Sequence, residues 1–567
     1  MKALQKSLSI FQIINICTPR FIICKKEWFS RCSVQSERLE IEMMSDTDDI
    51  AEICLQSSLT SKTWDPGDGV ISEAIYFDHL PSYEQMFQKI LLKNQLCIIG
   101  PFVTAAWPSR QLWVQKNGTP NFEYIGKHFG DATAPVADCS GEEFCSHPKS
   151  EMKVQEFLTY WQDYAEKGYP ANEKCLYLKD WHFTRDFPDS KVYTPPAFLC
   201  SDWINEFWDS AVEETAEDDY KFVYMGPRNS WTPFHADVLH SYSWSANICG
   251  RKMWIFYPPG AEAGLRDRHG QLVFDLRSSE LKDDLTFSNA SRSSGAAITV
   301  IQEPGEIIFV PSGWHHQVFN LEDTISINHN WTNGCGAHLS WAFLKSRLTA
   351  VQKEIEDCRA MDDWDLHCQL ILKSDSGMDY KDFFNFLSVI AEHRILALRQ
   401  ECVTDVCDRN GSRSWNQRPG KESGRCCLCL LTSEQFCGAV SGSESTHEDV
   451  CDGGNAHASR RTYSPCKDEA HIDVAPSELS SPAQRHAEEL AEKKRISDIL
   501  TVGGNNHLNC PHWAHSGPNL AVFDLRRIKV IVHNMLEQSE FKAVLPQLTS
   551  EPRELILNID KVLDCHR

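Results

Sequence analysis

A series of short strand-like segments between residues 221 and 331 constrains the fold of this chain more than any other feature. The segments are rich in β-branched and aromatic residues, and turns containing Gly or Pro separate them. They read KFVYMGP, TPFHADV, YSWSANICG, KMWIFYPP, AITVIQEPGEIIFVPSGWHHQVFNL and TISINHNW. Because closely spaced strands of this kind are typical of sandwiches and small barrels, we expect a core of either type.

Helical patterns lie on both sides of these strands. On the N-terminal side, residues 121–139 predict a helix followed by a strand, residues 152–168 a helix, and residues 175–183 a further strand. After Gly336 the apolar residues change to a helical period. The predicted C-terminal helices are 338–358, 379–401, 482–500, 523–541 and 551–564.

Changes in composition divide the chain into five segments. Residues 402–484 are rich in Ser, Gly and charged residues, include eight cysteines and have no sustained apolar period. We therefore expect them to be a disordered insert, because they cannot bury enough apolar surface to offset the loss of chain entropy. The expected segments are a largely disordered extension (1–69), a mixed α and β domain (70–345), helices (346–401), the insert (402–484) and further helices (485–567).

Composition also excludes several classes of function. The net charge of −23 argues against direct nucleic-acid binding, which requires a basic surface. No run of 18 or more apolar residues occurs, so no membrane-spanning helix is expected. The 23 cysteines are scattered, which indicates reduced thiols and a cytoplasmic protein. The group Cys426, Cys427 and Cys429 lacks the paired Cys-x-x-Cys spacing of a zinc site and does not predict one.

His235 and Asp237 are the first candidate functional residues. Residues two apart in a strand project from the same face, and burying an imidazole beside a carboxylate costs free energy unless something binds them. A divalent metal would do so, with a third ligand from His315 or His316 in the segment SGWHH. Two histidines and one carboxylate are typical of non-haem Fe(II) sites, but the same ligands could also hold zinc with a bound water.

Thr232 and Lys252 favour iron over zinc in this comparison. An organic co-substrate that occupies open positions on iron needs its remote carboxylate anchored. Lys252 would supply a cation and Thr232 a hydroxyl group on neighbouring segments of the predicted core. A hydrolytic zinc site has no evident use for a buried lysine. The residues therefore indicate an iron-dependent oxygenase with an anionic co-substrate.

The segments TPFHAD, GRKMWIFYPP and EPGEIIFVPSGWHHQVFNLEDTISINHNW resemble the Jumonji-C (JmjC) family of 2-oxoglutarate- and Fe(II)-dependent oxygenases. The resemblance implies an α+β fold with a double-stranded β-helix (cupin) core, N-terminal elements and a C-terminal helical region. It places the distal metal ligand on His316 and leaves His315 facing the other way. The site residues that it implies are His235, Asp237 and His316 for Fe(II) and catalysis, and Thr232, Lys252, Tyr177 and Asn328 for 2-oxoglutarate.

Within this family the chain is most similar to the small cytosolic hydroxylases that modify a lysyl residue of the translation termination release factor. The similarity implies lysyl C-4 hydroxylation with Fe(II), 2-oxoglutarate and O2, a protein partner, and a role in promoting termination. It does not extend to the first 69 residues or to the insert. Two alternatives stay open, namely an N-methyl-lysine demethylase of the same family and a catalytically silent cupin that binds a partner.

Overall fold

The computed structural model describes residues 74–143, 145–210, 219–283, 285–293, 295–411 and 518–566, all of which belong to one compact unit. Three sequence predictions lie outside these residues: the N-terminal extension, most of the insert with its Cys426–Cys429 group, and the helix expected at 482–500. Among the described helices, none is both long and apolar enough to cross a lipid bilayer.

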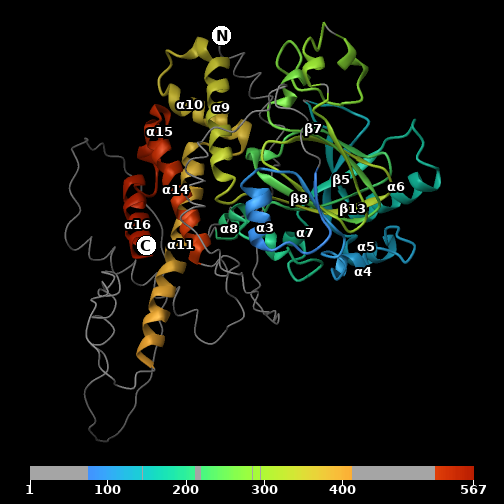
Figure 1. Ribbon diagram of the computed structural model, residues 1–567. Coiled ribbons are helices and arrows are strands. Elements are labelled where there is room, and N and C mark those ends of the chain that lie inside the picture. The colour runs from blue at the N-terminus through green and yellow to red at the C-terminus, as the bar shows by residue number, and fades with distance from the viewer. Residues whose placement is uncertain are drawn as a thin grey trace, which may run out of the picture. The chain divides into compact units, whose positions relative to one another are not determined.

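Within the described residues, the strands form a nine-stranded sheet and a four-stranded sheet (Figure 1). The large sheet has the order β1-β2-β11-β8-β13-β6-β5-β3-β4, and the small sheet has the order β10-β9-β12-β7. The strands are β1 (Ile75–Phe77), β2 (Cys97–Ile99), β3 (Thr133–Asp138), β4 (Lys149–Lys153), β5 (Leu176–Trp181), β6 (Lys221–Gly226), β7 (Trp231–His235), β8 (Tyr242–Cys249), β9 (Lys252–Tyr257), β10 (Ile298–Gln302), β11 (Ile307–Val310), β12 (His315–Asn320) and β13 (Thr324–Trp331).

The order of the strands identifies the core as a double-stranded β-helix. From β6 to β13 the chain passes repeatedly between the two sheets, and neighbouring strands in this part pair antiparallel. β1 and β2 extend one edge of the large sheet, and β5, β3 and β4 extend the other. The predicted fold class is therefore confirmed, and each segment that the sequence predicted as a strand between 221 and 331 contains at least one.

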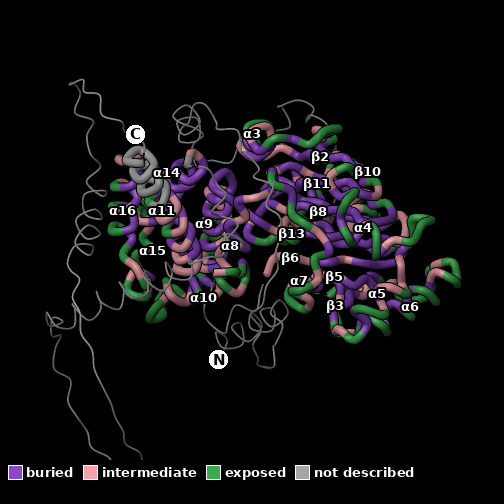
Figure 2. Tube along the Cα trace, turned by 90° about the horizontal axis from the view of Figure 1, so that it is seen from below, coloured by how far each residue is buried: buried purple, intermediate pink, exposed green. Residues whose placement is uncertain are grey.

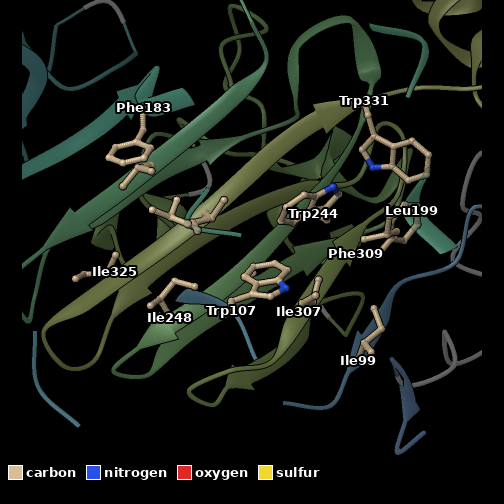
Figure 3. Close-up of a cluster of buried hydrophobic side chains, with 14 of the residues drawn as sticks. Ile99, Trp107, Phe183, Leu199, Trp244, Ile248, Ile307, Phe309, Ile325 and Trp331 are labelled. Carbon is tan, nitrogen blue, oxygen red and sulfur yellow. The ribbon is translucent and has the colours of Figure 1, made fainter. Parts of the chain in front are cut away.

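Side chains along β8 alternate between an apolar environment on one face of the strand and a polar environment on the other. Trp244, Ala246 and Ile248 join the apolar cluster that covers the outer face of the large sheet (Figure 3). The alternate residues Ser243 and Asn247 point to the opposite face, between the sheets, as the period of two requires. Polar residues thus line part of the barrel interior although the strand around them is almost wholly buried.

The remaining elements are helices. On the N-terminal side they are α3 (Tyr83–Met86), α4 (Pro108–Leu112), α5 (Phe122–Phe129), α6 (Val154–Glu166), α7 (Phe183–Asp186) and α8 (Trp203–Ser210). The C-terminal helices are α9 (Ala337–Glu354), α10 (Trp364–Ser376), α11 (Tyr380–Gly411), α14 (Pro518–Glu537), α15 (Ser539–Val544) and α16 (Pro552–Cys565). Their buried faces form a second apolar core (Figure 2).

Two details of the helical region differ from the sequence prediction. α11 continues to Gly411, past the boundary at 402 that composition suggested. α10 was not predicted, because polar Gln369 and Ser376 stand among its buried residues and weaken the amphipathic pattern. The side-chain oxygen of Gln369 accepts a hydrogen bond there from the backbone amide of Tyr380 at 3.0 Å.

A buried ion network ties the helical region together. The guanidinium of Arg394 in α11 donates to Glu206 in α8 at 2.8 and 2.9 Å and to Asp524 in α14 at 2.7 Å. Arg394 and Asp524 are fully buried. Burial raises the pKa of Asp524 to about 6 although Arg394 opposes the shift. The network therefore depends on the cation that joins its two carboxylates.

Replacing Arg394 with Ala is expected to lower the free energy of unfolding by roughly 3–5 kcal/mol, because it removes the guanidinium that pairs with two buried carboxylates. Chemical denaturation followed by circular dichroism measures this change. Arg359→Ala is the matched control, since its ion pair with Glu356 is exposed and such pairs contribute little. Equal effects of the two substitutions would contradict the assignment.

Candidate metal and anion site

The antiparallel pairing of β7 with β12 places His235 opposite His316. Two residues further along β12, Val318 pairs with Thr232, which lies three residues from His235. The extra residue in β7 is a β-bulge. Because of this bulge, Thr232 and His235 project from the same face, which strict alternation along the strand would not allow.

Asp237 reaches the same place by a different route from the one that the sequence suggested. The prediction relied on strand alternation, but β7 ends at His235. Asp237 is instead the N-cap residue of the following short 3-10 helix (Val238–His240). One ligand atom from each of His235, Asp237 and His316 lies within 4.8 Å of the others. The three predicted ligands are therefore brought together, as a divalent ion would require.

Hydrogen bonds orient each of these three side chains. Nδ1 of His235 lies 2.8 Å from the carbonyl oxygen of Pro233, and Nδ1 of His316 lies 3.1 Å from that of Trp314. When each Nδ1 carries the proton and donates to its carbonyl, each Nε2 is left as a free lone pair for a metal. This tautomer is the one that the geometry assigns to both rings.

The carboxylate of Asp237 is fixed by two donors. Ser243 Oγ donates to Asp237 Oδ2 at 2.7 Å, and Asn330 Nδ2 donates to Asp237 Oδ1 at 3.0 Å.

Burial and the neighbouring His316 lower the pKa of His235 to about 4. At neutral pH His235 is therefore uncharged, which is the form that binds a metal.

His315, the alternative ligand, lies on the opposite face of β12. Its ring packs against Phe234 with centroids 5.6 Å apart, and its Nδ1 lies 3.9 Å from a carboxylate oxygen of Glu262. It is adjacent in sequence to His316, so the strand period directs the two rings apart. The structure thus groups His316, and not His315, with the other two candidate ligands.

Lys252 is a buried cation on β9. Its side chain donates to Ser326 Oγ at 2.9 Å and to the Tyr177 hydroxyl at 3.3 Å, and the residue is 2% exposed. Burial, and secondarily the nearby Lys179, lower its pKa to about 7. Across the described ranges no carboxylate forms an ion pair with it, so its environment fits an anionic ligand.

Further small polar side chains lead away from this cation through Ser326. Asn328 Nδ2 donates to Ser326 Oγ at 3.2 Å, and Asn328 pairs across the ladder with Ser245. The buried Ser245 Oγ has no hydrogen-bond partner among the described residues. Such an orphaned hydroxyl costs free energy unless a ligand satisfies it, so this part of the interior fits a carboxylate-bearing molecule beside Lys252.

The polar residues Ser243, Ser245, Ser326 and Asn330 were missed by sequence reasoning. The available signal was that polar residues stand at every second position, at 243, 245 and 247 and again at 326, 328 and 330, with apolar or aromatic residues between them. In a barrel strand, polar residues at every second position usually face water or a ligand. Here both strands are buried, so a ligand-binding interior is the better interpretation of the pattern.

Asp237→Ala and His316→Ala are each expected to abolish high-affinity binding of a divalent ion, because each removes one of three ligands. His315→Ala is the matched control, since it removes a neighbouring buried imidazole that points elsewhere. Titration with Co(II), followed by its absorption spectrum, measures the affinity. Loss of binding in His315→Ala but not in His316→Ala would place the ligand on the other histidine.

Comparisons with known proteins agree with this site. A family model described as "JmjC domain, hydroxylase" matches residues 222–331. The chain is 52% identical over 330 residues to 2-oxoglutarate and iron-dependent oxygenase JMJD4 of Gallus gallus, an alignment that covers 58% of this chain and 76% of the relative. It is 46% identical over 344 residues to JMJD4 of Homo sapiens, covering 60% and 81% respectively.

A plant relative carries a different activity in its name. Over 320 residues the chain is 41% identical to "Arginine-specific demethylase JMJ20" of Arabidopsis thaliana, with 54% of this chain and 67% of the relative covered. The similarity to the JMJD4 proteins is higher and extends over more of their length. The chain therefore belongs to the JmjC-domain family of 2-oxoglutarate and iron-dependent oxygenases.

Proposed function

We propose that this oxygenase is a protein hydroxylase that adds a hydroxyl group to C-4 of a lysyl residue in the translation termination release factor, in the cytoplasm. The observation that carries the chemistry is that the barrel groups three candidate metal ligands and also buries a cation, Lys252, that forms no ion pair with any described carboxylate. The similarity to the JMJD4 proteins, at 52% and 46% identity, supports an oxygenase, and the family description "JmjC domain, hydroxylase" supports the choice of hydroxylation. The release factor itself is an expectation from the sequence pattern.

We assign Fe(II) to His235, Asp237 and His316. Both imidazoles would use Nε2, because their Nδ1 atoms are engaged by backbone carbonyls. Ser243 and Asn330 hold the Asp237 carboxylate in place, so that little reorganisation is required on metal binding. Bound iron, together with 2-oxoglutarate and O2, would supply the oxidation of a substrate C–H bond.

We assign the remote carboxylate of 2-oxoglutarate to Lys252, with Thr232 and Tyr177 as further contacts and Asn328 on the side toward Ser245. A charge-assisted hydrogen bond from a buried ammonium is stronger than one between neutral groups. Lys252 would exchange its present weak contact with Tyr177, at 3.3 Å, for a paired anion. This exchange would offset the cost of keeping a cation in the barrel.

Demethylation is the second candidate, because a relative at 41% identity is named as an arginine demethylase. The chemistry differs only in which C–H bond is oxidised. A silent cupin is disfavoured, because the three candidate ligands are grouped and Lys252 is also present.

Incubation of the chain with Fe(II), 2-oxoglutarate, ascorbate and purified release factor is expected to add the mass of one oxygen atom to a lysyl peptide. Peptide mass spectrometry measures this, with Asp237→Ala as the control. Loss of one CH2 from a methylated lysyl or arginyl peptide would instead identify a demethylase. Absence of succinate formation under all conditions would support a binding role and contradict the proposal.

Lys252→Ala is expected to weaken 2-oxoglutarate binding on the order of a hundredfold or more. Loss of one partner from a buried pair costs roughly 3–5 kcal/mol, and each 1.4 kcal/mol corresponds to about tenfold in affinity. A 2-oxoglutarate titration of succinate production measures the effect. If the half-saturation concentration of 2-oxoglutarate were unchanged in Lys252→Ala, the assignment of Lys252 to the co-substrate would be wrong.

The pH dependence provides a control for this prediction. With its pKa near 7, free Lys252 is protonated below that pH and neutral above it, whereas the carboxylate requires the protonated form. The affinity for 2-oxoglutarate should be steady below about pH 7 and fall by up to tenfold per unit above it. In Lys252→Arg the guanidinium stays charged, so any remaining affinity should not show this fall.

A further inference from the structure

The backbone immediately after Asp237 adopts an unusual conformation. Leu239 and His240 both have left-handed φ angles, of 55° and 47°. Residues with a side chain rarely adopt this conformation, and two in succession persist only where the surroundings enforce it. The enforcing contacts therefore also fix the position of Asp237, which the same short turn carries.

The helical region provides two of these contacts. Leu239 is 5% exposed and belongs to the apolar core of the C-terminal helices, with Trp341 and Leu344 of α9. The ring of His240 stacks on Phe343 of α9, with centroids 4.2 Å apart and an interplanar angle of 28°. Leu239 thus packs in the core to which α9 contributes, and the adjacent His240 stacks directly on α9.

The third contact comes from the turn that precedes β12. Ser312 Oγ donates to the carbonyl oxygen of His240 at 2.5 Å. Gly313 has a φ of +73°, and a Cβ atom there would lie 3.1 Å from His240 Nδ1. This turn leads into His316, so the backbone segments that carry two of the candidate ligands meet at His240.

We propose that α9 sets the geometry of the metal site through this turn, with Leu239, His240 and Phe343 acting as positioning residues for Asp237. The inference rests on the proposed metal site and deepens it, because it assigns a role in ligand positioning to the C-terminal helices. Removing Phe343 would release His240 from the helix, and the turn could then relax toward an ordinary backbone conformation. The carboxylate of Asp237 would keep its hydrogen bonds from Ser243 and Asn330, but the backbone that carries it would no longer be held by α9, so its approach to the ion would be less closely fixed.

The test uses the full chain and Co(II) as the probe, because the absorption bands of bound Co(II) report on ligand geometry. Phe343→Ala is expected to weaken Co(II) binding by about tenfold or more, the scale found when outer contacts of metal ligands are removed. It should also shift the absorption bands at saturating Co(II). Phe343→Tyr keeps the ring and is expected to restore both properties.

Phe541→Ala is the matched control for stability. Phe541 is fully buried in the same helical core, on α15, so its removal should destabilise the helices while the affinity and the bands stay as in the wild type. The proposal is overturned if Phe343→Ala binds Co(II) like the wild type, or if Phe541→Ala alters the bands equally. Co(II) binding that Asp237→Ala does not weaken would instead refute the metal assignment itself.

Discussion

The pairing of β7 with β12 is the constraint on which the rest of the site depends. It sets His235 opposite His316, and its bulge turns Thr232 to the same face. Without the extra residue, either the histidine or the threonine would point out of the barrel, because side chains alternate strictly along a strand. A bulge costs ladder hydrogen bonds and is retained where it redirects a side chain. Here it lets one short strand present two candidate site residues to the barrel interior.

The interior of the barrel is divided between packing and binding. Strands of both sheets contribute to an apolar cluster that includes Trp254, Phe256 and Ile308, and this cluster holds the sheets together. Lys252 lies on the same strand as Trp254, is buried, and forms no ion pair with a carboxylate of the described residues. A buried cation and an orphaned hydroxyl at Ser245 both raise the free energy of the empty barrel. An anion paired with Lys252 would offset this cost, so in the proposed site the same groups would supply both affinity and specificity.

The sequence predicts the strands and the candidate ligands well, because the patterns that indicate them lie within short stretches of the chain. Alternation, Gly and Pro turns and the segment SGWHH are visible in short windows, and they locate β6 to β13 and His316. Asp237 was assigned for an incorrect reason, since the strand ends before it. What could not be predicted depends on contacts distant in sequence. The bulge in β7 arises from its register with β12, and Ser326 gains its role only through Lys252, 74 residues away.

The same long-range contacts show that the β-helix and the C-terminal helices are not independent units. Composition placed a boundary near residue 345, between strands and helices. Yet Leu239, from the barrel, is buried in the helical core, and Glu206, before the barrel, is paired with Arg394 in α11. A barrel without these helices would expose Leu239 and leave Glu206 without its cation. The helices therefore complete the core that buries Leu239, two residues after Asp237. This shared core is the physical basis of the proposal that a change in the packing of α9 reaches the candidate metal site without touching a ligand.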